Sequence, residues 1–451
     1  MRSEAALPWR ESLRLYAQPR VASMLFLGFS AGLPFLLVFS TLSAWLTQAG
    51  IQRATIGMLS WVGITYSIKF FWAPVVDRLP LPLLTRWLGR RRSWMLLAQI
   101  GLACGLAGLA LHDPATQLRT MVLCALLVAF SSATQDIAID AWRIESAEPS
   151  MQGAMSAAYQ LGYRIALIIA GAGALFLAAE HGWTVSYLSM AALVGIGLLT
   201  TLLVREPEQR IARETLQQEA RVLRFIETRQ HWPVSLRNAG AWFVGAVVCP
   251  FIDFFQRNGL KLGLLILCFV GLYRLTDITM GVMANPFYLS LGYTLAQIAA
   301  IAKGYGVIMS ILGAFLGGLA VARWGASRTL VIGGVLVILT NLGFALLAWF
   351  GQPSLIGLSL VISADNLSAG VAGTAFIAYL SGLTNTAYTA TQYALFSSLF
   401  TLPGKLMGGA SGYVVDGVGF MWFFVYTSAL GLPALWLIWR LNRRLPEQRE
   451  G

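Results

Sequence analysis

Long apolar segments alternate with short polar ones along the whole chain. Twelve of the apolar segments are long enough, as helices rising about 1.5 Å per residue, to cross a hydrocarbon layer of roughly 30 Å. They run over Val21–Leu46, Thr55–Val76, Trp94–Leu111, Leu118–Ala141, Met151–Ala179, Val185–Val204, Leu262–Leu289, Thr294–Ala322, Thr329–Phe350, Leu355–Leu380, Thr391–Val415 and Phe420–Trp439. We therefore predict an all-α membrane protein with twelve transmembrane helices.

The chain divides into two halves. Six predicted spans lie in residues 1–204 and six in residues 263–451, with a polar, basic linker over residues 205–262 between them. The linker ends in "NAGAWFVGAVVCPFIDFF", which Pro250 interrupts, so we expect an interfacial or re-entrant segment and not a thirteenth span. The stretches "QGAMSAAYQLGYR" and "QYALFSSLFTLPGK" follow the fourth and tenth spans, and each places a cation 12 or 13 residues after its Gln. Two pseudo-repeated six-helix bundles are the predicted architecture.

Positive charge is distributed unevenly between the loops. Of the 32 Lys and Arg residues, five lie within predicted spans and only Arg53 and Arg119 lie in loops on the side opposite the termini. Cytoplasmic loops of membrane proteins are enriched in Lys and Arg, so both termini are predicted to face the cytoplasm. The basic leader lacks a cleavage site, so the first span is expected to remain as a helix.

Composition excludes several classes of function. Hydrophobic residues make up 57% of the chain and charged residues 12%, whereas soluble domains carry about 25% charged residues. The net charge of +12 follows from the loop asymmetry, so we expect membrane lipid as the surroundings and no nucleic-acid partner. Isolated cysteines and histidines predict neither a disulfide framework nor a metal site. Without a Walker motif, an ATP-driven pump is disfavoured and no cofactor is expected.

Charged side chains inside the spans are the main functional candidates. An ion at mid-bilayer costs roughly 2.5 to 3.5 kcal/mol on insertion scales unless it is paired or faces water. Lys69 and Asp136 lie at similar depths, about 11 Å from one membrane face, so they can meet. Asp136, Asp140 and Arg143 share one helical face. We predict that Asp136 carries the coupled proton beside Lys69 and that Asp140 pairs with Arg143, although a permanent Asp136–Lys69 ion pair fits equally well.

A second group of residues is predicted to contact substrate. Arg164 lies near the middle of the fifth span, at the depth where transporters of this architecture bind substrate, and an Arg can hold a carboxylate by two parallel bonds. Its alternative role is pairing with a buried acid. Arg274 and Asp277 are expected to neutralise each other along one helix. The remaining substrate candidates are Gln135, Gln160, Tyr163, Asp365, Asn366 and Lys405.

The turn after the second span carries Asp77-Arg78 and, further on, Gly89-Arg90-Arg91. It resembles the loop motif of the major facilitator superfamily, which in that family latches the cytoplasmic helix ends in the outward-open state. The spacing here is longer than in the family. Asp77 and Arg78 therefore carry over more firmly than the distal arginines, and a simple positive-inside anchor is the alternative.

Scattered stretches narrow the resemblance to one branch of that superfamily. "GFSAGLPFLL", "KFFWAPVVDR", "TQDIAIDAWR", "PFIDFFQRN", "ADNLSAGVAGTAFIAYL" and "TATQYALFSS" are similar to segments of AmpG-type muropeptide permeases. The resemblance implies a multi-pass protein of the Gram-negative inner membrane, expected to be a monomer, that imports anhydro-muropeptides (GlcNAc-anhydroMurNAc peptides) for cell-wall recycling. The import would be driven by the proton motive force and linked to beta-lactamase induction and antibiotic resistance.

Two other functions stay open at this point. One is a major facilitator carrier for a different anionic substrate, such as an acyl-CoA or another sugar-peptide. The other is a membrane-embedded transferase that uses Asp136 and Asp140 as acids. The loops opposite the termini are short and nearly uncharged, which disfavours the transferase. We therefore expect a carrier and not an enzyme.

Overall fold

The computed structural model describes residues 14–51, 60–207 and 213–447, and within these residues all the regular elements are helical. Eleven helices of this part of the chain are long and apolar enough to cross a membrane. The first bundle contains α2 (Pro19–Val38), α3 (Ser40–Gln48), α5 (Ile64–Ser67), α6 (Ala73–Arg78), α8 (Arg90–Leu111), α9 (Pro114–Ser146), α10 (Pro149–Ile168), α11 (Ala174–His181) and α12 (Trp183–Leu203). A short helix, α7 (Leu84–Leu88), lies in the turn before α8.

The second bundle contains α16 (Leu260–Tyr273), α17 (Leu275–Ser290), α18 (Leu295–Ile298), α19 (Gly306–Trp324), α20 (Ala326–Phe350), α21 (Leu355–Leu383), α22 (Thr389–Ala429) and α23 (Leu432–Glu447). Helix α22 consists of two helices that are joined by a turn at Gly419. The φ of Gly419 is +77°, which only glycine adopts without strain. This turn falls at the predicted boundary between the last two spans. Each bundle has its own apolar core, centred on residues such as Leu102 and Val128 in the first and Phe269 and Phe396 in the second.

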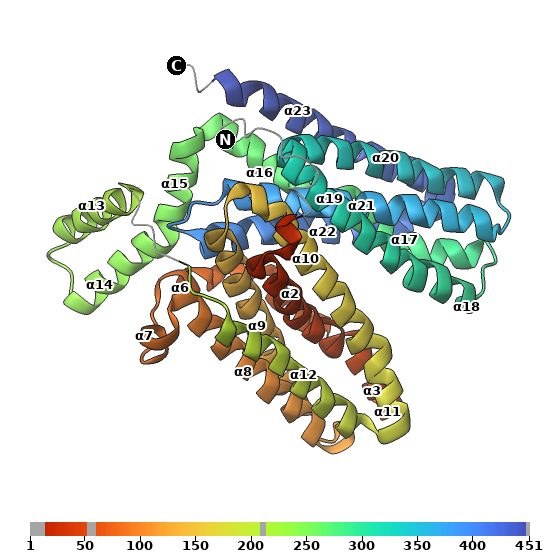
Figure 1. Ribbon diagram of the computed structural model, residues 1–451, viewed down its shortest axis with the longest axis horizontal. Coiled ribbons are helices and arrows are strands. Elements are labelled where there is room, and N and C mark those ends of the chain that lie inside the picture. The colour runs from red at the N-terminus through yellow and green to blue at the C-terminus, as the bar shows by residue number, and fades with distance from the viewer. Residues whose placement is uncertain (1–13, 52–59, 208–212, 448–451) are drawn as a thin grey trace.

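The two bundles form a V (Figure 1). They meet near the start of α2, the end of α23 and the turn that holds α6 and α7, and they diverge toward α11 in one bundle and α18 in the other. We call the first end the terminal side and the second the far side. Helices α10 and α19 cross where the bundles meet, and Gly153 of α10 lies against Gly318 and Val321 of α19.

The second predicted span is not a single helix. Its start lies in residues 52–59, outside the described part, and the remainder is divided into η2 (Ser60–Gly63), α5, η3 (Lys69–Phe71) and α6. Ile68 (φ −104°, ψ 8°), directly before Lys69, leaves the helical backbone conformation, and Trp72 (φ −108°, ψ −3°) ends η3 and begins α6. Pro74 in the next turn lacks the N–H that a continuous helix would need. The prediction of one continuous helix here is therefore wrong for the described residues.

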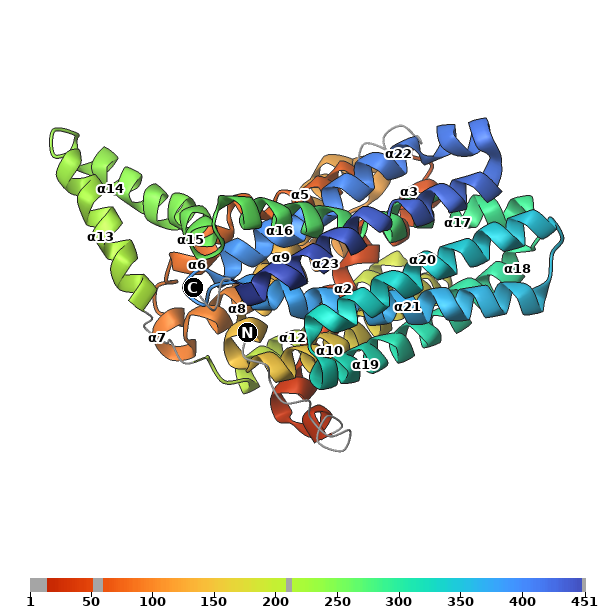
Figure 2. The same ribbon diagram turned by 90° about the horizontal axis from the view of Figure 1, so that it is seen from above.

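The linker is more helical than its sequence suggests. It forms α13 (Arg213–Thr228), α14 (Val234–Phe243) and α15 (Cys249–Asn258), and a π-helical turn joins α14 to α15 so that Val234–Asn258 is one helix of 25 residues. Pro250 does not end it, because this residue lies just after the π-helical turn Val244–Val248, where the backbone hydrogen-bond pattern of the α-helix is already irregular. The α13–α14 hairpin extends away from both bundles on the terminal side (Figure 2). The Val234–Asn258 helix is long and apolar enough to cross a membrane, so its interfacial or re-entrant placement stays a prediction.

Helices α2 and α10 are packed through glycine. A Cβ added to Gly162 of α10 would lie 1.8 Å from the carbonyl oxygen of Leu25, and one added to Gly28 of α2 would lie 2.2 Å from that of Tyr159. Both neighbours are backbone atoms, which cannot move aside as a side chain can. The backbones therefore approach as closely as small-residue contacts allow.

We predict that Gly162→Ala destabilises the protein by about 1 to 3 kcal/mol, the usual cost of overpacking. The matched control is Gly195→Ala on α12, where an added Cβ would meet no atom within 4 Å. Thermal unfolding of both purified variants measures the difference. Equal melting temperatures would show that α2 and α10 do not depend on this contact.

Candidate functional site

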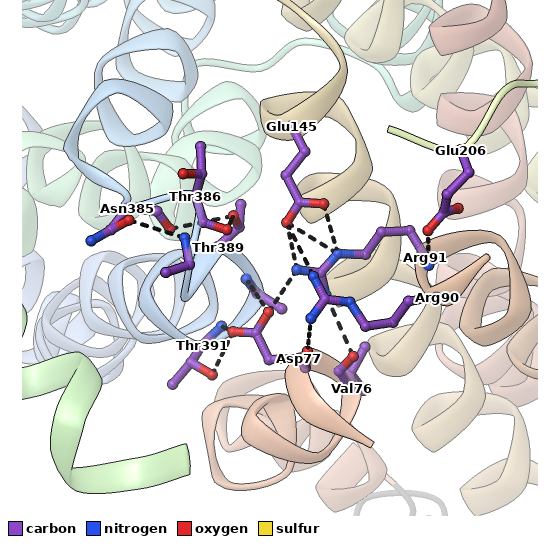
Figure 3. A network of polar contacts seen from close by, with 12 residues as sticks. Val76, Asp77, Arg90, Arg91, Glu145, Glu206, Asn385, Thr386, Thr389 and Thr391 are labelled. Carbon is purple, nitrogen blue, oxygen red and sulfur yellow. Dashed lines mark hydrogen bonds and ion pairs between the residues drawn. The ribbon is translucent and has the colours of Figure 1, made fainter. Parts of the chain in front are cut away.

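A buried carboxylate joins the two bundles on the terminal side (Figure 3). Asp77, at the end of α6, is 2% exposed and lies 2.6 Å from Nη2 of Arg91 on α8. Its other oxygen accepts hydrogen bonds from the backbone N–H and the hydroxyl of Thr391, each at 2.8 Å, and Ala390 N–H lies 3.3 Å from Oδ1. Asp77 of the first bundle thus binds the first turn of α22 in the second, where free N–H groups favour an anion.

The charge state of Asp77 follows from these neighbours. Burial raises the pKa of the Asp77 carboxyl, but Arg91, Arg90 and the Thr391 amide outweigh burial and hold the pKa below the usual value of an aspartate. A lowered folded-state pKa means that the ionised carboxylate stabilises the folded protein. That stabilisation is complete above pH about 4, the ordinary pKa of Asp, and declines as the pH falls below it.

Arg91 connects Asp77 to a second acid. Its Nη2 lies 2.5 Å from Oε1 of Glu145 at the end of α9, and its side chain is only 1% exposed. Glu206, after α12, accepts hydrogen bonds from the backbone N–H groups of Arg91 and Arg92 at 2.7 and 3.1 Å, and so caps the start of α8. The network therefore ties α6, α8, α9 and α22 together.

The structure reverses the ranking of the two arginine groups. Sequence resemblance favoured Arg78 over the distal arginines, yet Asp77 is bonded to Arg91, while the guanidinium of Arg78 lies over the ring of Tyr388 at 5.4 Å. The long turn that contains α7 brings Arg91 back to Asp77, so the stretched spacing does not separate them. Arg78 thus contacts the α21–α22 turn directly, whereas Arg91 is connected to α22 only through Asp77.

A second carboxylate holds the same turn from the linker side. Asp253 of α15 accepts hydrogen bonds from Asn385 Nδ2 and Gln392 Nε2, both at 2.9 Å, and pairs with Arg257 at 2.9 Å. Gln392 also accepts from the backbone N–H of Asn385 at 2.8 Å. The start of α22 is thus held by α6 and by the linker helix.

Arg143 crosses between the bundles one layer deeper. It is fully buried, lies 3.4 Å from Oδ1 of Asp140, and donates to Ser381 of α21 at 2.7 Å and to Gln152 of α10 at 2.9 Å. Its guanidinium also lies over the ring of Tyr393 at 5.2 Å. Its bond to Ser381 makes Arg143 a second cross-bundle contact of the terminal side.

Lys69 and Asp136 lie close to each other inside the first bundle. The Lys69 side chain is 8% exposed, and its charge acts on both Asp136 and Asp140. No Lys69–carboxylate contact falls within 4.0 Å among the described residues. Several buried polar atoms here have no hydrogen-bond partner in the described part: Asp136 Oδ1, Tyr66 Oη, Ser132 Oγ and Gln135 Nε2. Asp136 is therefore placed near a cation but is not locked into a direct ion pair.

The Gln135 side chain is buried inside the first bundle, and its contact with substrate stays a prediction. Its side chain is 0% exposed, and its Oε1 accepts a hydrogen bond from Ser30 of α2 at 2.7 Å. Gln135 therefore bridges α2 and α9 inside the first bundle. The polarity of this residue was visible in the sequence, but the direction in which it points was not.

Polar residues near the middle of α10 and α21 contact each other where the two bundles meet. Gln160 of α10 donates to the hydroxyl of Thr374 on α21 at 2.5 Å. Arg164 follows Gln160 by one turn of α10, and Arg274 lies at the break between α16 and α17, 3.2 Å from Asp277. Arg164 and Arg274 are close enough for electrostatic repulsion between their guanidinium groups. Arg164 and Arg274 thus bring one cation from each bundle to this interface.

The other candidates are more dispersed. Asp365 lies on α21 and is coupled electrostatically to Asp277, whereas the Asn366 amide donates to the carbonyl of Ile362 on its own helix at 3.0 Å. The Tyr163 ring lies 6.2 Å from that of Tyr159. Lys405 is on α22, but its side chain lies outside the described part of the chain. Among the described residues, no group of three His, Cys, Asp or Glu side chains could hold a metal ion.

Comparison with known proteins identifies the class. The profile of the Major Facilitator Superfamily matches residues 24–407. Two examples of solved structures with the same fold are the following. The human organic anion transporter MFSD10 (TETRAN) aligns with a TM-score of 0.65 at 16% identity, covering 93% of this chain and 100% of that one. The proton:xylose symporter XylE aligns with a TM-score of 0.61 at 12% identity, covering 96% of each. The protein is a major facilitator transporter, which confirms the predicted fold class in its all-helical form.

Sequence relatives narrow the class. "Putative transporter AmpG 4" of Rickettsia felis is 34% identical over 96% of this chain and 99% of its own length. "Anhydromuropeptide permease" of Escherichia coli strain K12 is 35% identical over 94% of this chain and 80% of its own length. The chain belongs to the family of AmpG-type permeases, as its sequence motifs suggested. It is a transporter and not an enzyme.

We predict that Arg91→Ala lowers the free energy of unfolding by about 3 to 5 kcal/mol, because it leaves the buried Asp77 without its cation. Arg86→Ala is the control, since Arg86 is exposed on α7 and its loss should change stability by no more than about 0.5 kcal/mol. Denaturant unfolding followed by tryptophan fluorescence measures both. If the two variants are equally stable, the Asp77–Arg91 bond does not hold the terminal side.

Proposed function

We propose that this protein is a proton-driven importer of anhydro-muropeptides. In this proposal it has twelve membrane-spanning helices, lies in the inner membrane of a Gram-negative bacterium with both termini in the cytoplasm, and works as a monomer without a cofactor. The observation that carries the substrate assignment is the 35% identity with the E. coli anhydromuropeptide permease over 94% of the chain. The far side of the V would then face the periplasm, and the structure would correspond to the state that receives substrate from outside.

The arrangement of charge supports an anionic substrate. Among the described residues, no carboxylate oxygen lies within 4.0 Å of the Arg164 guanidinium, although a lone cation inside a membrane span is costly. An Arg without an acid partner at the bundle interface is suited to a ligand that brings its own carboxylates, as the peptide of a muropeptide does. The same charge would suit another anionic substrate, so the choice of a muropeptide rests on the sequence relative and not on the charge.

Asp136 is the proposed proton site. It lies inside a span, near the charge of Lys69, and retains a buried oxygen without a hydrogen-bond donor in the described residues. Neutralising this carboxylate would release Lys69 from its electrostatic partner and change how α9 packs against α5 and η3. One proton moving down a proton motive force of about 150 mV supplies roughly 3.5 kcal/mol, equivalent to about 300-fold accumulation before the work of moving the substrate's own charge is subtracted.

For Asp136→Asn in proteoliposomes we predict that gradient-driven uptake of labelled GlcNAc-anhydroMurNAc-tetrapeptide falls about tenfold or more, because an amide cannot take up the coupled proton. Equilibrium binding of the same ligand should change by no more than about threefold. Asp416→Asn, at an exposed position of α22, serves as the matched control and should retain parental uptake. Uptake by Asp136→Asn that still collapses with an uncoupler would place the proton elsewhere, and parental uptake that ignores the gradient would refute coupling altogether.

For Arg164→Ala we predict a loss of affinity of about tenfold or more for the tetrapeptide ligand, since a charge-assisted pair contributes roughly 1.5 to 3 kcal/mol. Affinity for the same ligand with its carboxylates amidated should be similar in parent and variant. Isothermal titration of the purified proteins measures both. A loss of equal size for both ligands would mean that Arg164 supports the fold of the interface and does not read carboxylates.

A further inference from the structure

Arg274 occupies an unusual position for a residue paired along its own helix. It lies at the break between α16 and α17, with φ −94° and ψ 4°. This break is near the middle of the Leu260–Ser290 span. Its shortest contact with Asp277 is 3.2 Å, from Nε, and this Nε is without a hydrogen bond of good geometry. A guanidinium saturated by a carboxylate would instead make two parallel bonds.

The other end of the guanidinium points at the first bundle. Nη1 of Arg274 lies 2.9 Å from the place where a Cβ on Gly373 of α21 would be, and Oε1 of Gln160 lies 3.3 Å from the same place. Gln160 belongs to α10 of the first bundle and is bonded through its Nε2 to Thr374. The absence of a side chain at Gly373 therefore lets Arg274 of one bundle and Gln160 of the other approach a common point.

Charge at this point is unbalanced. Arg164 lies one turn beyond Gln160 on α10, and Arg274 is the charged group that acts on it. Within the described residues, Asp277 is the one carboxylate within 4.0 Å of either guanidinium. Asp365 also interacts electrostatically with Arg274 but lies beyond 4.0 Å, so Arg274 has one directly contacting acid and Arg164 has none among the described residues. An anion placed between the two arginines would give both of them a direct partner.

We propose that Arg274 is a substrate-binding residue that exchanges Asp277 for a carboxylate of the ligand, and that this carboxylate is held between Arg274 and Arg164, one from each bundle. The inference rests on the proposed function, because it concerns the same anionic sugar-peptide. It adds that the ligand bridges the two bundles directly. A ligand bound in this way stabilises the state in which α10 and the α16–α17 break approach each other, which is the differential contact that alternating access requires.

The decisive test distinguishes whether Arg274 binds a carboxylate of the ligand or only neutralises Asp277. Binding of GlcNAc-anhydroMurNAc-tetrapeptide and of its amidated form is measured for Arg274→Gln, Asp277→Asn and the double variant in nanodiscs. Arg274→Gln should bind the carboxylate ligand about tenfold or more weakly and the amidated ligand within about twofold of the parent. Asp277→Asn should bind the carboxylate ligand as tightly as the parent or more tightly, because it removes the competing acid. The double variant should resemble Arg274→Gln.

Opposite results overturn the proposal. If Arg274 only neutralises Asp277, each single variant is damaged for both ligands and the double variant, which removes both charges, recovers the parent's affinity. If Arg274→Gln does not fold, Arg274→Lys replaces it, and an unchanged affinity for the carboxylate ligand then refutes the bidentate contact. A parent protein that binds neither ligand refutes the proposed substrate itself, whereas a parent that binds with an unaffected Arg274→Gln refutes only this inference.

A neutral substitution gives a second, independent measure. Gly373→Ala adds a methyl group where Arg274 Nη1 and Gln160 Oε1 converge and should weaken carboxylate binding without changing any charge. Gly382→Ala on the same helix adds its methyl where no atom lies within 4 Å and should bind like the parent. Equal affinities for the two alanine variants would contradict the proposed contact point.

Discussion

The ionised Asp77 carboxylate, buried between Arg91 and the first turn of α22, is the interaction on which the shape of this transporter depends. It joins the bundles where they meet, and the bonds of Arg143 to Ser381 and of Gln160 to Thr374 continue that contact inward. The Tyr16 hydroxyl adds a hydrogen bond to the carbonyl of Phe315 on α19, and toward the far side the bundles diverge (Figure 1). Closing one side with charge and leaving the other open is what a carrier with alternating access requires.

The two groups of intramembrane charge differ in a way that suits two tasks. Inside the first bundle, Lys69 and Arg143 face Asp136 and Asp140, so cations and acids are equal in number and one proton changes the balance. At the interface, Asp277 contacts Arg274, while no carboxylate of the described residues lies within 4.0 Å of Arg164, so a ligand's carboxylate would supply the missing partner. We infer that the first group responds to the proton and the second to the substrate. Helix α10 and its neighbour α9 connect them.

Hydropathy and the distribution of Lys and Arg were sufficient to predict two helical bundles and a basic linker, because long apolar runs and loop charge act locally. The broken second span was not predictable from them, since Ile68 and Trp72 are as apolar as their neighbours and only their backbone angles differ. Arg91 was ranked below Arg78 because the path of the long turn is not encoded in spacing alone. The direction of Gln135 and the approach of Arg274 to Gln160 depend on how separate helices pack, which no single helix specifies.

Double electron–electron resonance between spin labels at Glu180, on α11, and Ser290, on α17, tests the central claim most directly. Both positions are exposed on the far side, and the four free cysteines would first be replaced. We expect a long distance in the parent without ligand, and a shift to shorter distances when Asp77→Asn weakens the terminal side or when the tetrapeptide ligand binds. An unchanged distribution under both conditions would contradict a transporter whose open face is set by the Asp77 contact.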